Sequence, residues 1–63
     1  MKPGKQVVYV KGRARKTGTI TEITGSGPSG YKTLSLQFAK GTAKDVPHRQ
    51  DDAGQGYWQD VND

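Results

Sequence analysis

Short runs of β-branched and aromatic residues, each bounded by glycine or by polar residues, recur along the chain. Residues 6–10 read QVVYV and residues 17–24 read TGTITEIT. Both runs predict β-strands, because branched and aromatic side chains suit a pleated, half-buried surface. Within the second run, Ile20 and Ile23 are three positions apart and cannot both face one side of a regular strand. We therefore expect a β-bulge or a strand end between them.

The clearest alternation of apolar and polar positions is in residues 32–38, KTLSLQF. Leu34, Leu36 and Phe38 fall on one face of a strand, and the polar residues between them fall on the other. The three apolar side chains are therefore predicted to lie in the core.

The rest of the chain adds a loop and two shorter elements. Residues 25–30, GSGPSG, predict a loop, because glycine, proline and serine together disfavour the interior of any regular element. Residues 42–46 predict a strand that Pro47 ends, since proline cannot donate to a sheet ladder. A polar segment follows, and residues 57–61, YWQDV, predict a fifth short strand or a helical turn.

These segments predict an all-β fold, a small SH3-like barrel of about five short antiparallel strands. No apolar residues recur at helical spacing over the length that a helix needs. With 63 residues and a mass of 6.8 kDa, the chain is too short for a second core, so we expect a single domain over residues 1–63. Nine glycines and five aromatic residues suit tight turns around a small core.

Composition limits the compartment and the class of protein. The chain has no cysteine, which excludes disulfide-stabilised secreted scaffolds and zinc ribbons. No stretch approaches the ~18 apolar residues of a membrane span, and the basic start lacks the apolar run of a signal peptide. We therefore expect a cytoplasmic protein with no membrane partner.

Charge is distributed unevenly along the chain. Residues 1–44 contain nine Lys or Arg and one acid, a net charge of +8, whereas residues 45–63 contain one Arg and five Asp, a net charge of −4. This asymmetry allows a basic face that meets an anionic partner, or an acidic segment that folds back and neutralises the basic part. A solvated surface without a ligand is the third interpretation.

The densest basic segment lies between the first two predicted strands, in residues 11–16, KGRARK. On a hairpin loop these side chains could reach outward together, and arginine is suited to bidentate contacts with phosphate. A plain solvated loop is the alternative. Tyr9 and Tyr31 could stack bases beside such a patch, whereas we interpret Trp58 as a core residue. The predicted ligand-binding residues are Lys11, Arg13, Arg15, Lys16, Lys5, Lys32, Tyr9 and Tyr31.

The remaining candidate sites favour non-catalytic interpretations. Residues 25–30 could cradle a phosphate, but they lack the Gly-Lys-Ser/Thr ending of a P-loop and no helix is predicted after them. His48 is the only histidine, so a zinc site would need Asp51 or Asp52 as further ligands. These two aspartates are adjacent and point apart in an extended chain, which makes them a poor acid and base pair. We therefore predict no catalytic residues, no metal site, no cofactor and no enzyme activity.

The first third of the chain, KPGKQVVYVKGRARKTGTITEI, resembles the start of a KOW-type or Tudor-like SH3 barrel. In those domains a glycine precedes a strand, a second glycine follows it, and a Gly-x-Ile/Val pair opens the next strand. The matching positions are Gly4, Val7, Gly12, Gly18 and Ile20. Gly4 and Gly12 would allow positive-φ turns, and Gly18 would allow a close backbone approach. Such domains generally bind nucleic acid or protein tails, so the resemblance implies a binding module.

The later segment, KDVPHRQDDAGQGYW, resembles the ending of small bacteriophage proteins in which a Val-Pro-His segment precedes an aromatic cluster. The matching positions are Val46, Pro47, His48, Tyr57 and Trp58. The resemblance implies a phage origin, and with it the cytoplasm of a host cell, but no particular activity.

Three hypotheses about function are consistent with these patterns. The favoured one is a module that binds nucleic acid through its phosphates. The second is a phage accessory protein that docks on a host protein through aromatics such as Tyr57 and Trp58, and inhibits or redirects it. The third is a sponge that sequesters a small nucleotide messenger, in a pocket that a homo-oligomer could complete.

Overall fold

The computed structural model describes residues 2–51, 54 and 56–62, and over these residues the chain forms five β-strands and one 3₁₀ turn. The elements are β1 (Gln6–Lys11), β2 (Ala14–Ser26), β3 (Lys32–Phe38), β4 (Gly41–Val46), the 3₁₀ turn η1 (Arg49–Asp51) and β5 (Tyr57–Gln59). The predicted all-β fold of five antiparallel strands is confirmed, and the last predicted element is a strand rather than a helical turn. In this described part, no helix is long and apolar enough to cross a membrane.

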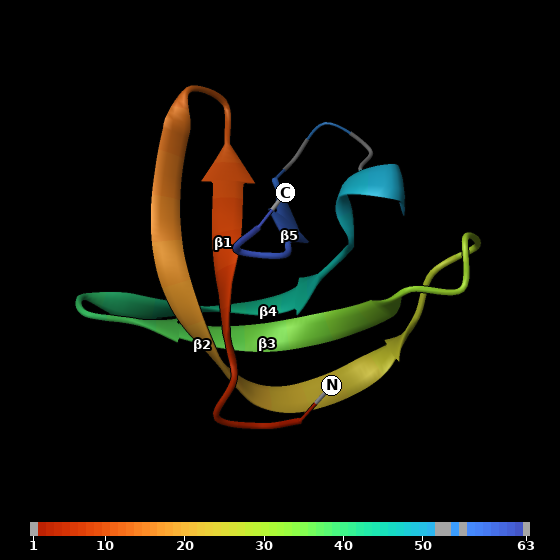
Figure 1. Ribbon diagram of the computed structural model, residues 1–63, viewed down its shortest axis with the longest axis horizontal. Coiled ribbons are helices and arrows are strands. Elements are labelled where there is room, and N and C mark those ends of the chain that lie inside the picture. The colour runs from red at the N-terminus through yellow and green to blue at the C-terminus, as the bar shows by residue number, and fades with distance from the viewer. Residues whose placement is uncertain (1, 52–53, 55, 63) are drawn as a thin grey trace.

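The strand order explains how a single sheet becomes a barrel. The five strands are hydrogen-bonded in the order β4-β3-β2-β1-β5. In Figure 1, β1 and the first half of β2 stand upright, and the second half of β2 turns to run with β3 and β4 across them. The two ends of the sheet then meet, because the Trp58 N–H donates to the Pro47 carbonyl at 2.9 Å and His48 bridges to Trp58. This closure turns the single sheet into a small barrel.

The bend of β2 coincides with two irregularities in its pairing to β3. The register shifts once between Ile20 and Glu22, and again between Ile23 and Gly25. The irregularity predicted between Ile20 and Ile23 is therefore confirmed. An extra residue in one strand increases its bend and twist, and here it lets buried Ile20 and half-buried Ile23 both pack on the core.

β2 is longer than the sequence pattern predicts. It begins at Ala14 and ends at Ser26, so it takes residues from the predicted basic loop and from the predicted glycine-rich loop. The connection from β1 to β2 is reduced to Gly12 and Arg13. Most of the basic segment is therefore held in paired strands, which fixes the direction of its side chains.

The core lies between the two halves of the bent sheet. Its buried residues are Val7, Ile20, Leu34, Leu36, Val46 and Trp58. The predictions for Leu34, Leu36 and Trp58 are confirmed, whereas Phe38 packs on the core but is only half-buried. The Trp58 indole Nε1–H donates to the Lys32 carbonyl at 2.8 Å, so its one polar atom is paired inside the barrel.

The positive-φ prediction for Gly4 and Gly12 is confirmed, whereas the close approach at Gly18 involves side chains rather than the backbone. Gly4 and Gly12 have φ angles of +94° and +60°, the region that favours glycine. Gly18 is in a close approach: a Cβ there would stand 2.7 Å from Phe38 Cε1 and 3.2 Å from Leu36 Cβ. The phenylalanine ring therefore takes the place that a side chain at position 18 would fill.

Candidate functional site

The basic segment forms the end of the β1–β2 hairpin. The two strands pair from Gln6 opposite Thr19 to Lys11 opposite Ala14. Figure 1 shows this hairpin turn extending beyond the crossing strands at the top of the view. The segment's four cationic residues are all exposed: Lys11, Arg13, Arg15 and Lys16. A short turn between paired strands thus presents four positive charges within six residues.

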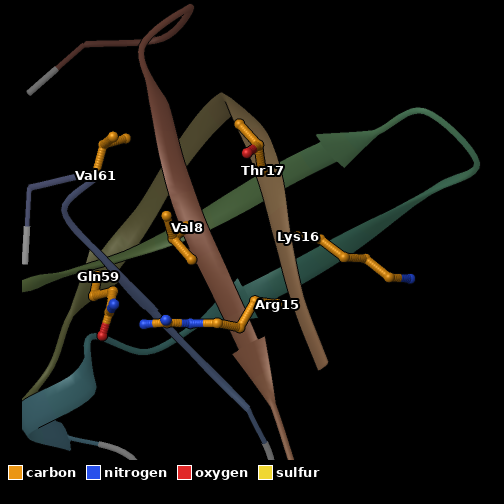
Figure 2. Close-up of a pocket in the computed structure, with 6 residues that line it drawn as sticks. All are labelled: Val8, Arg15, Lys16, Thr17, Gln59 and Val61. Carbon is orange, nitrogen blue, oxygen red and sulfur yellow. The ribbon is translucent and has the colours of Figure 1, made fainter. Parts of the chain in front are cut away.

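These cations do not all point the same way. Arg15 pairs with Val10 and Lys16 pairs with Tyr9, so alternation along the strand sends their side chains to opposite faces of the hairpin. Figure 2 shows Arg15 and Lys16 extending in opposite directions. The Lys16 Nζ lies 5.8 Å from the centroid of the Phe38 ring, a cation–π arrangement. The positive charge therefore surrounds the hairpin instead of lining one side.

No acid neutralises the hairpin in the part of the chain that the structure describes. The one ion pair found there joins Lys5 Nζ to Asp60 Oδ1 at 3.9 Å. Asp51 instead accepts two hydrogen bonds from Ser29, and Asp45 is exposed at a bulge of β4. Among the described acids, Asp60 therefore pairs with Lys5 of the basic part of the chain, and none pairs with a cation of the hairpin. Asp52 and Asp63 lie outside the described residues.

The other predicted ligand-binding residues lie elsewhere on the barrel. Lys5 precedes β1, at the end of that strand away from the hairpin turn. The Nζ of Lys32, at the start of β3, donates to Ser26 Oγ at 3.2 Å. Tyr9 is half-buried, with its ring tilted against that of Phe38 at 5.3 Å between centroids. The eight predicted residues therefore do not converge on a single site, and the hairpin contains four of them.

Tyr31 belongs to an aromatic cluster that includes the only histidine. Its ring stacks on His48 at 3.6 Å with an interplanar angle of 7°, and His48 meets Trp58 edge to face at 4.5 Å. His48 is buried, and its Nδ1 accepts the Gln50 N–H at 3.1 Å. Tyr31 is 40% exposed, with one ring face covered by the imidazole. Over the described residues, no group of three His, Cys, Asp or Glu side chains could hold a metal ion.

The glycine-rich loop is tied to the rest of the molecule. The Ser29 N–H and hydroxyl donate to the Asp51 carboxylate at 2.9 and 2.7 Å, which joins the loop to η1. The Gly27 N–H donates to the Tyr31 carbonyl at 2.7 Å, and the Gly30 N–H donates to the Gly27 carbonyl at 3.0 Å. Three backbone donors that a phosphate cradle would need are therefore already used, and this favours the plain-loop interpretation.

A hollow of about 250 Å³ opens on the outer face of the barrel beside the hairpin. Its lining residues are Val8, Arg15, Lys16, Thr17, Gln59 and Val61, and Figure 2 shows them together. Sequence reasoning found only the two cations in this set. The pairing of β5 with β1 brings Gln59 beside Val8, and no pattern in the sequence predicted that contact.

Comparison with known proteins adds no relative to this geometry. No family model, no curated protein and no solved structure matches the chain. The arrangement itself offers a cluster of cations with no ion-pair partner among the residues that the structure describes, and a small neighbouring hollow with hydrogen-bonding and apolar walls. Such a surface can bind an anion and fix the orientation of a group attached to it.

Proposed function

We propose that the protein is a non-enzymatic binding module for an anionic partner, and that this partner is nucleic acid held through its phosphates. One observation carries the proposal: the β1–β2 hairpin exposes four cations that have no ion-pair partner among the described residues. Clustered unpaired cations release counterions from a phosphate backbone, which is the main source of affinity in binding that is not sequence-specific.

The chemistry of the four side chains agrees with a phosphate ligand. Arg13 and Arg15 carry planar guanidinium groups that can donate two parallel hydrogen bonds to one phosphate. Lys11 and Lys16 add point charges from the two paired strands of the same short hairpin. A strand of nucleic acid offers phosphates at regular spacing and could contact several of these groups at once.

The alternative of docking on a host protein through aromatics has less support. Trp58 is 1% exposed in the core and Tyr57 is only partly exposed, so neither offers a large contact surface. A sponge for a small nucleotide would use the same cations, and the experiment below separates it from an oligonucleotide binder.

The test is fluorescence anisotropy of a labelled single-stranded oligonucleotide, titrated with protein at several salt concentrations. We expect the slope of log Kd against log salt to correspond to about three or four phosphate contacts, each contributing ~0.7 for a single strand. In the double variant Lys11→Gln/Arg13→Gln, affinity at low salt should fall by about tenfold or more, and the slope should decrease by ~1.4.

The matched control is Lys2→Gln/Lys44→Gln, which removes the same charge from exposed positions away from the hairpin. Its affinity should change by less than about threefold, because distant exposed charges are screened at moderate salt. Equal losses in the two variants would show only a dependence on net charge and would contradict a hairpin site. If oligonucleotides do not bind but a nucleotide raises the melting temperature, the sponge is the better function.

A further inference from the structure

The hollow next to the hairpin belongs to one continuous face of the sheet. Residues directly opposite each other on paired strands point to the same side. Thr17, Val8 and Gln59 form one such row across β2, β1 and β5. Val7 and Trp58 lie on the opposite side, in the core. The hollow, which we call the Gln59 hollow after this lining residue, therefore opens outward. It is separate from the barrel interior.

Gln59 is the most informative residue of the hollow. It is only 3% exposed, yet its side chain makes no hydrogen bond to any described residue. In the described part of the chain, every side-chain N or O atom that is cut off from solvent has a hydrogen-bond partner. The amide of Gln59 has none there, so it must contact solvent, and Gln59 lines the hollow. Gln59 and Arg15 both line this hollow (Figure 2).

The remaining walls combine apolar surface with further donors. Val8 of β1 lies between Thr17 of β2 and Gln59 of β5. Val61, which is 58% exposed, also lines the hollow and adds apolar surface. Thr17 adds a hydroxyl, and Arg15 adds a guanidinium whose plane can stack on a flat ring or bind a phosphate. A free anion accepts hydrogen bonds, so a site for it needs only hydrogen-bond donors from the protein. The Gln59 amide presents both a donor and an acceptor, so the hollow is better suited to a group with a mixed edge.

We propose that the Gln59 hollow holds one unpaired nucleobase of a single-stranded nucleic acid whose phosphates lie along the β1–β2 hairpin. The inference rests on the proposed function. A nucleobase has flat apolar faces, an edge with donors and acceptors for Gln59 and Thr17, and a neighbouring phosphate for Arg15. A hollow of about 250 Å³ is smaller than the ~300–1,000 Å³ of sites for drug-sized ligands, which limits it to a single group.

This placement has a consequence for the form of nucleic acid that binds. In a duplex the Watson–Crick edges are already paired and the bases are stacked, so they cannot enter the Gln59 hollow. The protein should therefore bind a single strand more tightly than a duplex of the same length. Binding through phosphates alone would favour the duplex, because its charge density is higher.

The direct test is a two-dimensional ¹H–¹⁵N NMR titration, which resolves the side-chain NH₂ of Gln59 as its own signal. Two probes are compared: a short single-stranded oligonucleotide and an abasic oligomer with the same sugar-phosphate backbone. We expect the backbone amides of Lys11 and Arg13 to shift with both probes. The Gln59 NH₂ and the Val8 and Val61 amides should shift only with the probe that carries bases.

The outcomes distinguish the two proposals. Hairpin shifts with both probes but no response at Gln59 would overturn the nucleobase site and leave phosphate binding intact. No shift at the hairpin with either probe would overturn the proposed function, and the nucleobase site with it. A response at Gln59 to an acidic peptide, with none to the oligonucleotide, would assign the hollow to a protein partner and also overturn the inference.

A variant supplies the second readout. Gln59→Leu keeps the size of the side chain and removes only its hydrogen-bonding atoms, so the fold should be retained, as Trp58 fluorescence can verify. Single-strand affinity should fall by about threefold to tenfold, the loss expected for an uncharged hydrogen bond. The salt slope should not change. A parent-like preference for single strands in this variant would contradict the assignment.

Discussion

Gly18 shows how one residue fixes the packing of this small barrel. It is buried in β2, and its missing side chain makes room for the Phe38 ring and the Leu36 Cβ. The sequence suggested a close backbone approach at this position. The structure shows that the close neighbours are side chains of β3, so the effect of a substitution depends on whether the Phe38 ring can move.

We predict that Gly18→Ala destabilises the fold by about 1–3 kcal/mol, the usual range for overpacking a core. The measurement is the urea midpoint followed by Trp58 fluorescence. Gly25→Ala is the matched control, since it lies in the same strand and would contact only the Thr33 hydroxyl at 3.2 Å. That variant should stay within about 0.5 kcal/mol of the parent. Equal stability of the two variants would mean that Phe38 moves aside freely.

Trp58 combines burial with a single paired donor. Its ring fills the core, and its Nε1–H satisfies the Lys32 carbonyl at the start of β3. Trp58→Phe keeps an aromatic ring but leaves that carbonyl without its donor. We predict a loss of about 1–3 kcal/mol, measured by far-UV circular dichroism in urea because the fluorescent residue is removed. Tyr57→Phe, at the neighbouring half-buried position, should change stability by less than about 0.5 kcal/mol.

At the scale of elements, the glycine-rich loop and η1 act as a connected pair. Two hydrogen bonds from Ser29 to Asp51 link segments 22 residues apart in the chain. Figure 1 shows the loop and the 3₁₀ turn on the same side of the barrel. Composition alone predicted only that residues 25–30 form a loop. The link was not predictable because any of several aspartates could have served as the acceptor.

We predict that Ser29→Ala and Asp51→Ala are coupled in a double-mutant cycle by about 0.5 kcal/mol or more. Hydrogen exchange at the Ser29 amide should also be faster in Asp51→Ala, because the N–H loses its acceptor. Gln50→Ala, an exposed neighbour in η1, is the control and should leave this exchange unchanged. Additive effects of Ser29→Ala and Asp51→Ala would show that the two hydrogen bonds do not hold the loop.

At the scale of the whole molecule, the barrel is closed by few contacts. β5 has three residues, and it joins the end of the chain to the segment after β4 through the Trp58 N–H and the Pro47 carbonyl. The core residues of β1, β2, β3, β4 and β5 form one cluster around Trp58. A single small core of this kind should unfold as one cooperative unit.

We therefore predict that urea unfolding monitored by Trp58 fluorescence coincides with unfolding monitored by far-UV circular dichroism. The slope of the free energy against urea should be about 1 kcal/mol/M, at the low end for small proteins. If fluorescence changes at a lower urea concentration than circular dichroism, β5 detaches before the rest of the sheet, and the closure is a separate event.

The sequence alone predicted the approximate positions of the strands, the bulge near Ile20 and the cationic character of residues 11–16. These features are local: alternation, branching, glycine content and charge act over a few neighbouring residues. It also placed Trp58 in the core, because a chain this poor in apolar residues needs its largest one inside.

Which residues come into contact depended on the folded arrangement of the strands. The long β2 strand placed Arg15 and Lys16 on opposite faces of the hairpin, which separated charges that are adjacent in the sequence. The pairing of β5 with β1 brought Gln59 next to Val8 and created the hollow. Such contacts depend on strand order and register, and both follow from the burial of the whole core rather than from any local pattern.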